Sequence, residues 1–382
     1  MQKLEELSNY TLLCIYLVVV LGSWSIMFTF GYTFITKSSH VPNFHKYSGY
    51  LVFFLCMFSW MKAHHTSPGY ITAQNIIKFD NYPYDNFLFI NKTCPTVGIR
   101  KLARSKFDRF SNRHVARFDH YCGWICNTVG EENYRYFLFF LLVHVAMCIY
   151  GTIITWRLLV GEVQDRDLYN AIFYNGNTGE EVHADFWIIV HYMVMKHFEL
   201  TSILILMGAM SIVLVLFFCF HLYMAANGMT TNEFYKWRQV KKWYKREKSR
   251  YQKALKEGKV HQKTVSGDDN SNDDVSHHNG GGMNELSDVD VGCVGPVKNI
   301  NNDVVPKEHE NKIDTDTISD PGPPPVNIYN RGIVENFKEV LFPRSLRIDA
   351  LMRYSKCMES QRTNKQNVVS PLVDNNTKTK ST

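Results

Sequence analysis

Three side chains that together can generate a thiolate nucleophile lie within four positions of one another. They are Asp119, His120 and Cys122, in the stretch Asp119-His-Tyr-Cys122. A cysteine attacks as its thiolate, so a histidine that takes the proton activates it. A carboxylate can hold that histidine in the required tautomer. Because neighbours in sequence need not touch in space, a chance polar cluster in a loop remains the alternative interpretation.

Four apolar runs predict membrane-spanning helices. They are residues 10–36, 47–61, 136–156 and 200–220. A bilayer core of about 30 Å needs about 20 helical residues, so the second run must rely on its flanking lysines to reach both interfaces. The first run could instead be a signal peptide, but it is long for one and no small-residue cleavage site follows it.

The distribution of lysine and arginine predicts how these runs are oriented. The loop 62–135 and the segment 236–250 are rich in both, whereas the connections 37–46 and 157–199 are not. We therefore expect the N-terminus, the central loop and the tail to lie in the cytosol. A fifth span at 186–195 would place the basic tail outside, so we interpret that stretch as interfacial or as a helical lead-in. The basic clusters face the lipid bilayer, and we expect no nucleic-acid partner because no recognisable binding module is present.

These features predict an all-α polytopic membrane protein with four transmembrane helices and a small cytosolic cysteine-rich-type domain between the second and third. Composition divides the chain into the N-terminus with two helices (1–62), the cytosolic domain (63–135), two helices with a lumenal loop (136–224), a basic membrane-surface helix (225–263), a disordered linker (264–325), a docked C-terminal segment (326–345) and a tail (346–382).

The position of Cys122 suggests what it would act on. The third apolar run begins soon after it, so the thiol is expected at the level of the lipid headgroups. A long-chain acyl-CoA has a polar head for the cytosol and an apolar chain for the bilayer. Lys101 and Arg104 are candidates for binding the CoA phosphates. Since the loop is expected in a reducing compartment, its cysteines should not form disulfides.

Residues 101–133 resemble the cysteine-rich domain of the DHHC protein S-acyltransferases (palmitoyltransferases). The resemblance rests on Lys101-Leu-Ala-Arg104, Asp119-His-Tyr-Cys122-Gly-Trp124 and Asn127-Thr-Val-Gly130. Three further segments match motifs of the family, in the expected order among the apolar runs. They are Ser67-Pro-Gly69, Thr230-Thr-Asn-Glu233, which also resembles a helix cap, and Tyr329 to Phe342 with Asn336.

The resemblance implies a two-step reaction. Cys122 would be acylated from palmitoyl-CoA and would pass the acyl group to juxtamembrane cysteines of membrane-associated proteins. His120 would be the general base and Asp119 would orient it, while Trp124 and Asn127 would shape the site. The family also implies a location in the endoplasmic reticulum or Golgi.

The chain departs from the family at Tyr121, where the motif has histidine, and at the zinc knuckles. The family binds two zinc ions, each through three cysteines and one histidine. One of these sets keeps Cys94 and His114, and the other keeps at most Asp108. Structural zinc needs four ligands, mostly sulfur and nitrogen, so we expect none in the second set and regard zinc in the first as doubtful. Aromatic packing by Phe107, Phe110, Phe118, Tyr121 and Trp124 is the predicted substitute.

Two functions are compatible with these observations. The first is a working S-acyltransferase, and the second is an inactive relative that binds partner proteins as a membrane scaffold. The lost ligands favour the scaffold, whereas the retained Asp119, His120 and Cys122 favour the enzyme. A transporter or channel is disfavoured, because no charged residue lies within the four runs.

Overall fold

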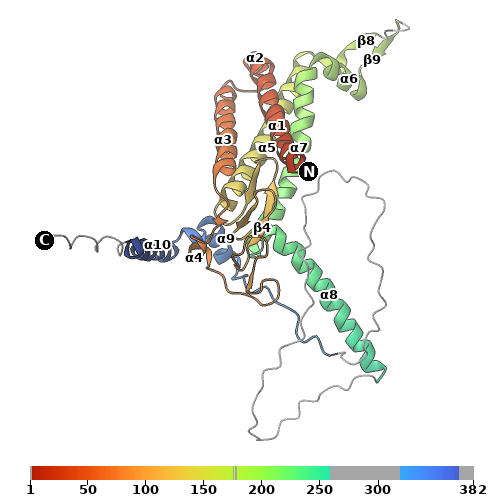
Figure 1. Cartoon of the computed structure of the whole chain (residues 1–382). Coiled ribbons are helices and arrows are strands. Elements are labelled where there is room, and N and C mark those ends of the chain that lie inside the picture. Colours follow the sequence, from red (N-terminus) through yellow and green to blue (C-terminus); the bar gives the residue numbers. More distant parts are fainter. Residues whose placement is uncertain (1, 175, 177–178, 259–318, 370–382) are drawn as a thin grey trace, which may run out of the picture. The chain divides into compact units, whose positions relative to one another are not determined.

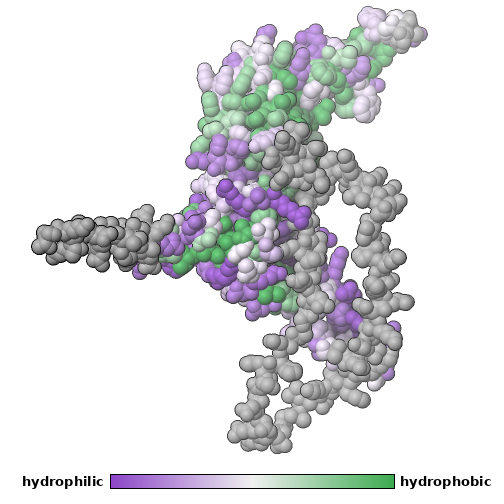
Figure 2. Space-filling model, in the orientation of Figure 1, coloured by the Kyte–Doolittle hydropathy of each residue, from purple (hydrophilic) through white to green (hydrophobic). Residues whose placement is uncertain are grey.

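Helices form most of the protein (Figure 1). The computed structural model describes residues 2–174, 176, 179–258 and 319–369. Three segments are long and apolar enough to cross a bilayer: Tyr10–Lys37, Tyr134–Asp165 and Phe198–Ala226. They confirm the first, third and fourth predicted spans, and the chain is a multi-pass membrane protein. In Figure 2, apolar residues gather over the helices of this region and polar residues over the loop next to them.

The first span is not one uniform helix. It consists of α1 (Gln2–Ile26), a π-helical turn at Met27–Gly31, and α2 (Tyr32–Lys37). The third and fourth predicted runs lie in α5 (Tyr134–Asp165) and α7 (Phe198–Ala226).

The second predicted run forms α3 (His45–His65), a helix of 21 residues. It is not among the three segments that are long and apolar enough to span, so the total of four spans stays a prediction. The short apolar stretch forms α6 (Phe186–Lys196), which ends at His197 directly before α7, as a helical lead-in would.

The helices of the apolar region pack around α5. Tyr16 on α1 lies 2.9 Å from the Nε2 atom of His144 on α5, and the thiol of Cys56 on α3 contacts the sulfur of Met147 on α5. Helix α7 packs along α5 as well. Thus α1, α3 and α7 share a single core with α5, and this core continues to Cys122.

The loop between α3 and α5 contains short antiparallel strands, which the all-α prediction did not include. The strands are β1 (Tyr70–Ile71), β2 (Lys92–Thr93), β3 (Arg100–Lys101), β4 (Lys106–Asp108), β5 (Arg113–Val115), β6 (His120–Cys122) and β7 (Asn127–Val129). They pair as β1-β5-β4, β2-β3 and β6-β7. A short helix, α4 (Ile76–Phe79), follows β1. Strands of two or three residues carry too little alternation to be recognised in a sequence.

The connection between α5 and α6 is short and structured. It has a 3₁₀ turn at Leu168–Asn170 and a hairpin of β8 (Ile172–Tyr174) and β9 (Glu181–His183).

The segment Tyr329–Thr382 belongs to the same unit as residues 1–231. It contains α9 (Ile333–Leu341), a 3₁₀ turn (Arg344–Leu346) and α10 (Ile348–Val369). Helix α9 packs on α7 and α5, which is consistent with the predicted docked segment. Helix α10 occupies most of the stretch predicted to be a tail.

Residues Asn232–Ile328 form a separate unit. The basic helix predicted here is α8 (Thr231–Lys256). Within the unit, the Tyr244 hydroxyl donates to the Gly322 carbonyl at 2.9 Å, and Lys248 pairs with Asp320 at 3.1 Å. Most of the predicted linker, residues 264–325, lies outside the described residues.

Candidate active site

The β6–β7 hairpin brings His120 and Cys122 to the same face. In a strand, residues two apart point to the same side, and these two are the ends of β6. The register pairs His120 with Val129 and Cys122 with Asn127. The amide of Asp119 donates to the Val129 carbonyl at 2.9 Å, so the ladder includes all three predicted residues.

Asp119 and His120 form a buried charged pair. The Nδ1 atom of His120 lies 2.6 Å from an Asp119 carboxylate oxygen. Burial alone would lower the pKa of His120, but the hydrogen bonds to Asp119 and Cys122 raise it to about 10. Burial likewise opposes ionisation of Asp119, yet the hydrogen bond from His120 lowers its pKa to about 2. The geometry thus favours a proton held on His120, next to the Cys122 sulfur.

Thr231 holds the Asp119 carboxylate from the other side. Its amide donates to one carboxylate oxygen at 2.7 Å and its hydroxyl to the other at 3.0 Å. The sequence interpretation placed this threonine in a helix cap and missed its contact with Asp119. The match of Thr230-Thr-Asn-Glu233 to a family motif was the available signal.

Asn127 and His64 attach the hairpin to the end of α3. The Asn127 amide nitrogen lies 3.1, 2.9 and 2.9 Å from the carbonyl oxygens of Ala63, His64 and Thr66. These carbonyls belong to the last turn of α3, where no further turn can satisfy them. The His64 ring nitrogen lies 2.7 Å from the Ile125 carbonyl oxygen. Trp124, by contrast, is 46% exposed, and its carbonyl accepts a hydrogen bond from the Trp60 indole of α3 at 3.3 Å.

His221 and Phe137 enclose the His120 ring. The centroid of the His120 ring lies 5.6 Å from that of the His221 ring and 5.2 Å from that of the Phe137 ring. The Tyr134 hydroxyl contacts the His221 ring at 3.2 Å. A lone histidine at the end of an apolar run gave no sequence signal for this role.

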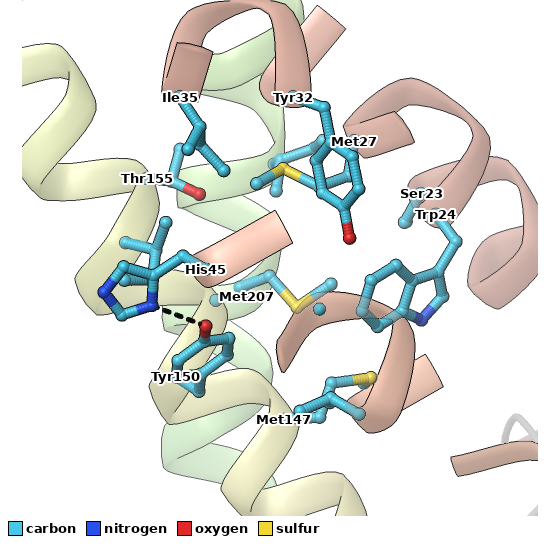
Figure 3. Close-up of a pocket in the computed structure, with 15 residues that line it drawn as sticks. Ser23, Trp24, Met27, Tyr32, Ile35, His45, Met147, Tyr150, Thr155 and Met207 are labelled. Atoms are coloured by element: carbon cyan, nitrogen blue, oxygen red, sulfur yellow. Dashed lines mark hydrogen bonds between the residues drawn. The ribbon is translucent and has the colours of Figure 1, made fainter. Parts of the chain in front are cut away.

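Cys122 is buried in an apolar cluster that continues to a cavity among the helices. The cluster includes Trp24 and Met147, and both also line the cavity (Figure 3). The cavity lies between α1, α2, α3, α5 and α7 and encloses about 40 Å³. At one side the Tyr150 hydroxyl lies 2.8 Å from the His45 ring nitrogen, as the dashed line in Figure 3 shows.

The residues at the knuckle positions do not fit structural zinc. The Asp108 carboxylate accepts the Thr128 hydroxyl at 2.6 Å and the Ser111 amide at 3.0 Å. Tyr121 stacks on Phe110 with centroids 4.4 Å apart, and its hydroxyl lies 3.6 Å from the Cys126 sulfur.

The retained pair of ligands also lacks partners for a metal. The His114 ring packs edge-on against Phe107 at 5.6 Å. Among the described residues, Asp119, His120 and His221 are the one group of three or more His, Cys, Asp or Glu with ligand atoms within 4.8 Å of one another. Cys94 and His114 belong to no such group there. Packing of Phe107, Phe110 and Tyr121 and one buried carboxylate thus occupy the knuckle positions, whereas Trp124 is 46% exposed; that aromatic packing replaces the metal stays a prediction.

Arg104, a predicted phosphate ligand, is fully buried. Its guanidinium pairs with Glu339 at 3.1 Å, donates to the Gly228 carbonyl at 2.9 Å and lies over the Tyr329 ring. Lys101 is partly exposed in β3, opposite Lys92 of β2. The structure therefore brings Asp119, His120 and Cys122 together. Arg104 is not part of this group, because its contacts are with Glu339 and Tyr329 of the C-terminal segment.

Glu339 on α9 is the centre of a buried charge cluster. Its carboxylate also pairs with Arg344 at 2.6 Å and lies 3.7 Å from Arg117. Burial would raise the pKa of Glu339, but Arg117, Arg104 and Arg344 lower it to about 2. Sequence reasoning missed this acid, which lies with Asn336 and Val340 on the buried face of α9; the match of Tyr329 to Phe342 to a family motif was the available signal.

Comparison with known proteins agrees with this arrangement. Residues 88–238 match the family model described as DHHC palmitoyltransferase. Palmitoyltransferase ZDHHC4 of Mus musculus is 34% identical over 46% of this chain and 52% of its own length, and that of Bos taurus is 30% identical over 60% and 66%. Palmitoyltransferase SWF1 of Yarrowia lipolytica is 35% identical over 48% and 46%. The chain thus spans about half to two thirds of these relatives. Residues 88–238, which contain the β6–β7 hairpin, therefore form a domain of the DHHC palmitoyltransferase family.

Proposed function

We propose that this protein is a protein S-acyltransferase that moves a palmitoyl group from palmitoyl-CoA to cysteines of membrane-associated proteins. The observation that carries the proposal is the series Asp119, His120 and Cys122, in which His120 pairs with buried Asp119 at 2.6 Å and shares strand β6 with buried Cys122. The names of the similar palmitoyltransferases support the same activity.

In the first step, the Cys122 thiolate, whose proton is held on His120, attacks the thioester carbonyl carbon of the acyl-CoA. The new carbon–sulfur bond forms as the bond to the CoA sulfur breaks, and the CoA thiolate leaves with a proton. Ionised Asp119, held by Thr231, stabilises the imidazolium that forms on His120. The raised pKa of His120 favours this charged form.

In the second step, a substrate cysteine attacks the acyl-Cys122 thioester. Its thiol proton passes to a base and the Cys122 thiolate leaves, so the acyl group moves from one sulfur to another with no change in oxidation state. His120 is again the group within reach. Because the acyl chain anchors the intermediate in the bilayer, the substrate cysteine must lie close to the membrane.

The acyl chain would enter the cavity of Figure 3. A volume of about 40 Å³ has room for only a few water molecules, so side chains must move apart to admit a chain. Met27, Met147 and Met207 line the cavity, and the unbranched methionine side chain adapts readily to a new shape. Partly exposed Lys101 and exposed Lys92 are then the candidate cations for the CoA phosphates, whereas buried Arg104 is engaged by Glu339 and the Gly228 carbonyl.

The membrane arrangement follows from the same proposal. Helix α3 would complete four spans, the termini and the domain 63–135 would face the cytosol, and the endoplasmic reticulum or Golgi would be the location. Zinc has no part in the proposed reaction, because its positions hold Asp108, Thr128 and Tyr121 in other contacts.

Acyl labelling tests the proposal. Purified protein incubated with palmitoyl-CoA should gain a hydroxylamine-labile label, and Cys122→Ser should abolish it. Cys126→Ser is the matched control, because Cys126 lies on the same hairpin and contacts Tyr121. A label that persists in Cys122→Ser would contradict the assignment of the nucleophile.

The lost zinc ligands favour a second candidate, a scaffold that binds partner proteins without turnover. It predicts that folded wild-type protein stays unlabelled with acyl-CoAs of every chain length while it still captures its partners.

A further inference from the structure

A polar hollow lies between the loop at Asp80–Pro83 and the segment that follows α9. It encloses about 440 Å³, and its wall includes four arginines: Arg331, Arg344, Arg347 and Arg353. We call it the arginine pocket. It shares no lining residue with the cavity of Figure 3 and contains none of Asp119, His120 and Cys122.

Arg344 is the fixed part of this pocket. Its guanidinium pairs with Glu339, donates to the Asn81 carbonyl at 2.9 Å and lies 4.5 Å from the centre of the Tyr82 ring. These contacts leave the side chain only 13% exposed. The buried cluster around Glu339 thus gives the pocket a rigid wall.

Arg331 and Arg347 are the cations without a carboxylate partner. Both are exposed, and within the described part of the chain neither forms an ion pair. The Nε atom of Arg347 donates to the Phe342 carbonyl at 3.2 Å, which fixes the base of its guanidinium and leaves the two terminal nitrogens available.

The pocket carries an excess of positive charge. Four arginines face two acids, Asp80 and Asp349, which gives a net charge of +2. Both acids are already paired, Asp80 with Arg100 and Asp349 with Arg353. Arg331 and Arg347 are therefore the two arginines without an ion pair in the pocket, and Glu335, whose pKa both help to lower, already pairs with Lys338. The planar fork of arginine matches phosphate oxygens in a two-point hydrogen bond.

The surroundings place this pocket at the membrane surface. Arg135, at the start of α5, donates to the Leu341 carbonyl at 3.0 Å, so the segment after α9 lies at the end of a spanning helix. Large apolar residues are exposed between the arginines of the pocket in the sequence: Phe342 is 64% exposed and Ile348 is 75% exposed. Figure 2 shows apolar next to polar surface in this part of the molecule. Apolar residues that alternate with arginines are typical of segments at the lipid interface.

We propose that the arginine pocket binds a phosphate monoester, carried by the headgroup of an anionic membrane lipid. Arg331 and Arg347 bind the phosphate, Arg344 supports it, and the exposed apolar side chains rest on the acyl region. The shared chemistry could also admit a soluble phosphate monoester, such as the ribose phosphate of coenzyme A. The site is independent of acyl transfer to Cys122.

Native mass spectrometry of the full chain in detergent tests this inference. Short-chain phosphatidylinositol monophosphate should bind at least about tenfold more tightly than phosphatidylinositol, because the added phosphate gains charge-assisted hydrogen bonds. The Arg331→Gln/Arg347→Gln double variant should lose that difference. Lys241→Gln should retain it, because Lys241 is an exposed cation of α8 outside the pocket.

A second set of binding measurements decides whether the bound phosphate belongs to a lipid or to a soluble molecule. If the inositol phosphate headgroup alone, or coenzyme A but not dephospho-coenzyme A, binds wild type as tightly as the lipid does, the ligand is soluble rather than a lipid. Equal binding of all ligands by wild type and the double variant would overturn the site. The midpoint of thermal unfolding and the single variants Arg331→Gln and Arg347→Gln separate lost binding from lost folding.

Discussion

Within the loop between α3 and α5, the reactive series and the knuckle positions are held in different ways. At the reactive end, polar hydrogen bonds join the β6–β7 hairpin to distant parts of the chain: Thr231 binds Asp119, and Asn127 binds the end of α3. The knuckle end, which includes Tyr121 and Thr128 of the same hairpin, is held by contacts within the loop, the Phe110–Tyr121 stack and the bond from Thr128 to Asp108.

This difference indicates which positions can change. A reacting series needs particular atoms at particular distances, so its supports are directional hydrogen bonds. A knuckle only has to keep its shape, and metal ligands can be replaced by apolar packing and one satisfied carboxylate. We expect the two ends to respond to substitution in separable ways, activity at one and stability at the other.

The largest expected effect is that of Asp119→Asn. Loss of the charge that stabilises protonated His120 should lower the rate of Cys122 acylation by about 10²–10⁴-fold. Single-turnover labelling with palmitoyl-CoA measures it. Asp108→Asn, in the same loop, is the matched control and should label at a rate close to that of wild type. Equal losses in the two variants would remove the distinction between the ends.

Glu339→Gln should be the most destabilising change at a distance from Cys122. It leaves the buried Arg104 and Arg117 without their carboxylate, and breaking a buried ion pair costs about 3–5 kcal/mol. Glu335→Gln removes an exposed ion pair on the same helix and should leave the stability close to that of wild type. Thermal unfolding in detergent compares the two, and similar midpoints would contradict the role of the cluster.

The pH dependence of stability should depend on the Asp119–His120 pair. The Asp119 pKa falls from 3.8 to about 2, so its contribution is present above pH 3.8 and is lost as the pH falls towards 2. The His120 pKa rises from 6.5 to about 10, so its contribution is full below pH 6.5 and is lost as the pH rises through 10. The midpoint of thermal unfolding, measured from acid to alkaline pH, should fall at both extremes of pH. In Asp119→Asn these two changes should be smaller.

Smaller losses are expected at the knuckle end. Asp108→Ala leaves the buried Thr128 hydroxyl without its acceptor and should cost about 1–3 kcal/mol. Tyr121→Phe keeps the stack on Phe110 and should cost less than Tyr121→Ala, which also loses the ring interaction of about 0.5–1.5 kcal/mol. Denaturant unfolding would rank the three, and a Tyr121→Phe as unstable as Tyr121→Ala would argue against the stack.

The smallest expected effect is that of metal removal. Since Asp108, Thr128 and Tyr121 are engaged with one another and with Phe110, a strong chelator should leave the unfolding midpoint and the acyl label unchanged. Metal analysis of the purified chain should find less than one zinc per chain. Two zinc ions per chain would mean that the loop is held differently from the way described above.

Sequence reasoning reached the parts of the site that depend on near neighbours. Asp119, His120 and Cys122 lie close together because they fall within four positions, on strand β6 and directly before it, and the three apolar spans follow from composition alone. Sequence reasoning could not predict contacts between residues that are far apart in the chain. Thr231 contacts Asp119 across 112 positions, and Arg104 contacts Glu339 across 235. A basic residue in a polar loop is usually exposed, so Arg104 gave no indication that it would be enclosed by a helix near the other end of the chain.

The pairing of Arg104 with Glu339 has a consequence for biosynthesis. During translation the loop that contains Cys122 emerges long before α9, and until Glu339 follows, Arg104 has no carboxylate to enclose it. An unfinished or truncated chain would therefore expose this arginine and the faces of Tyr82 and Tyr329 to the quality-control machinery of the cell. Full assembly of the reactive loop depends on synthesis of the distant C-terminal segment.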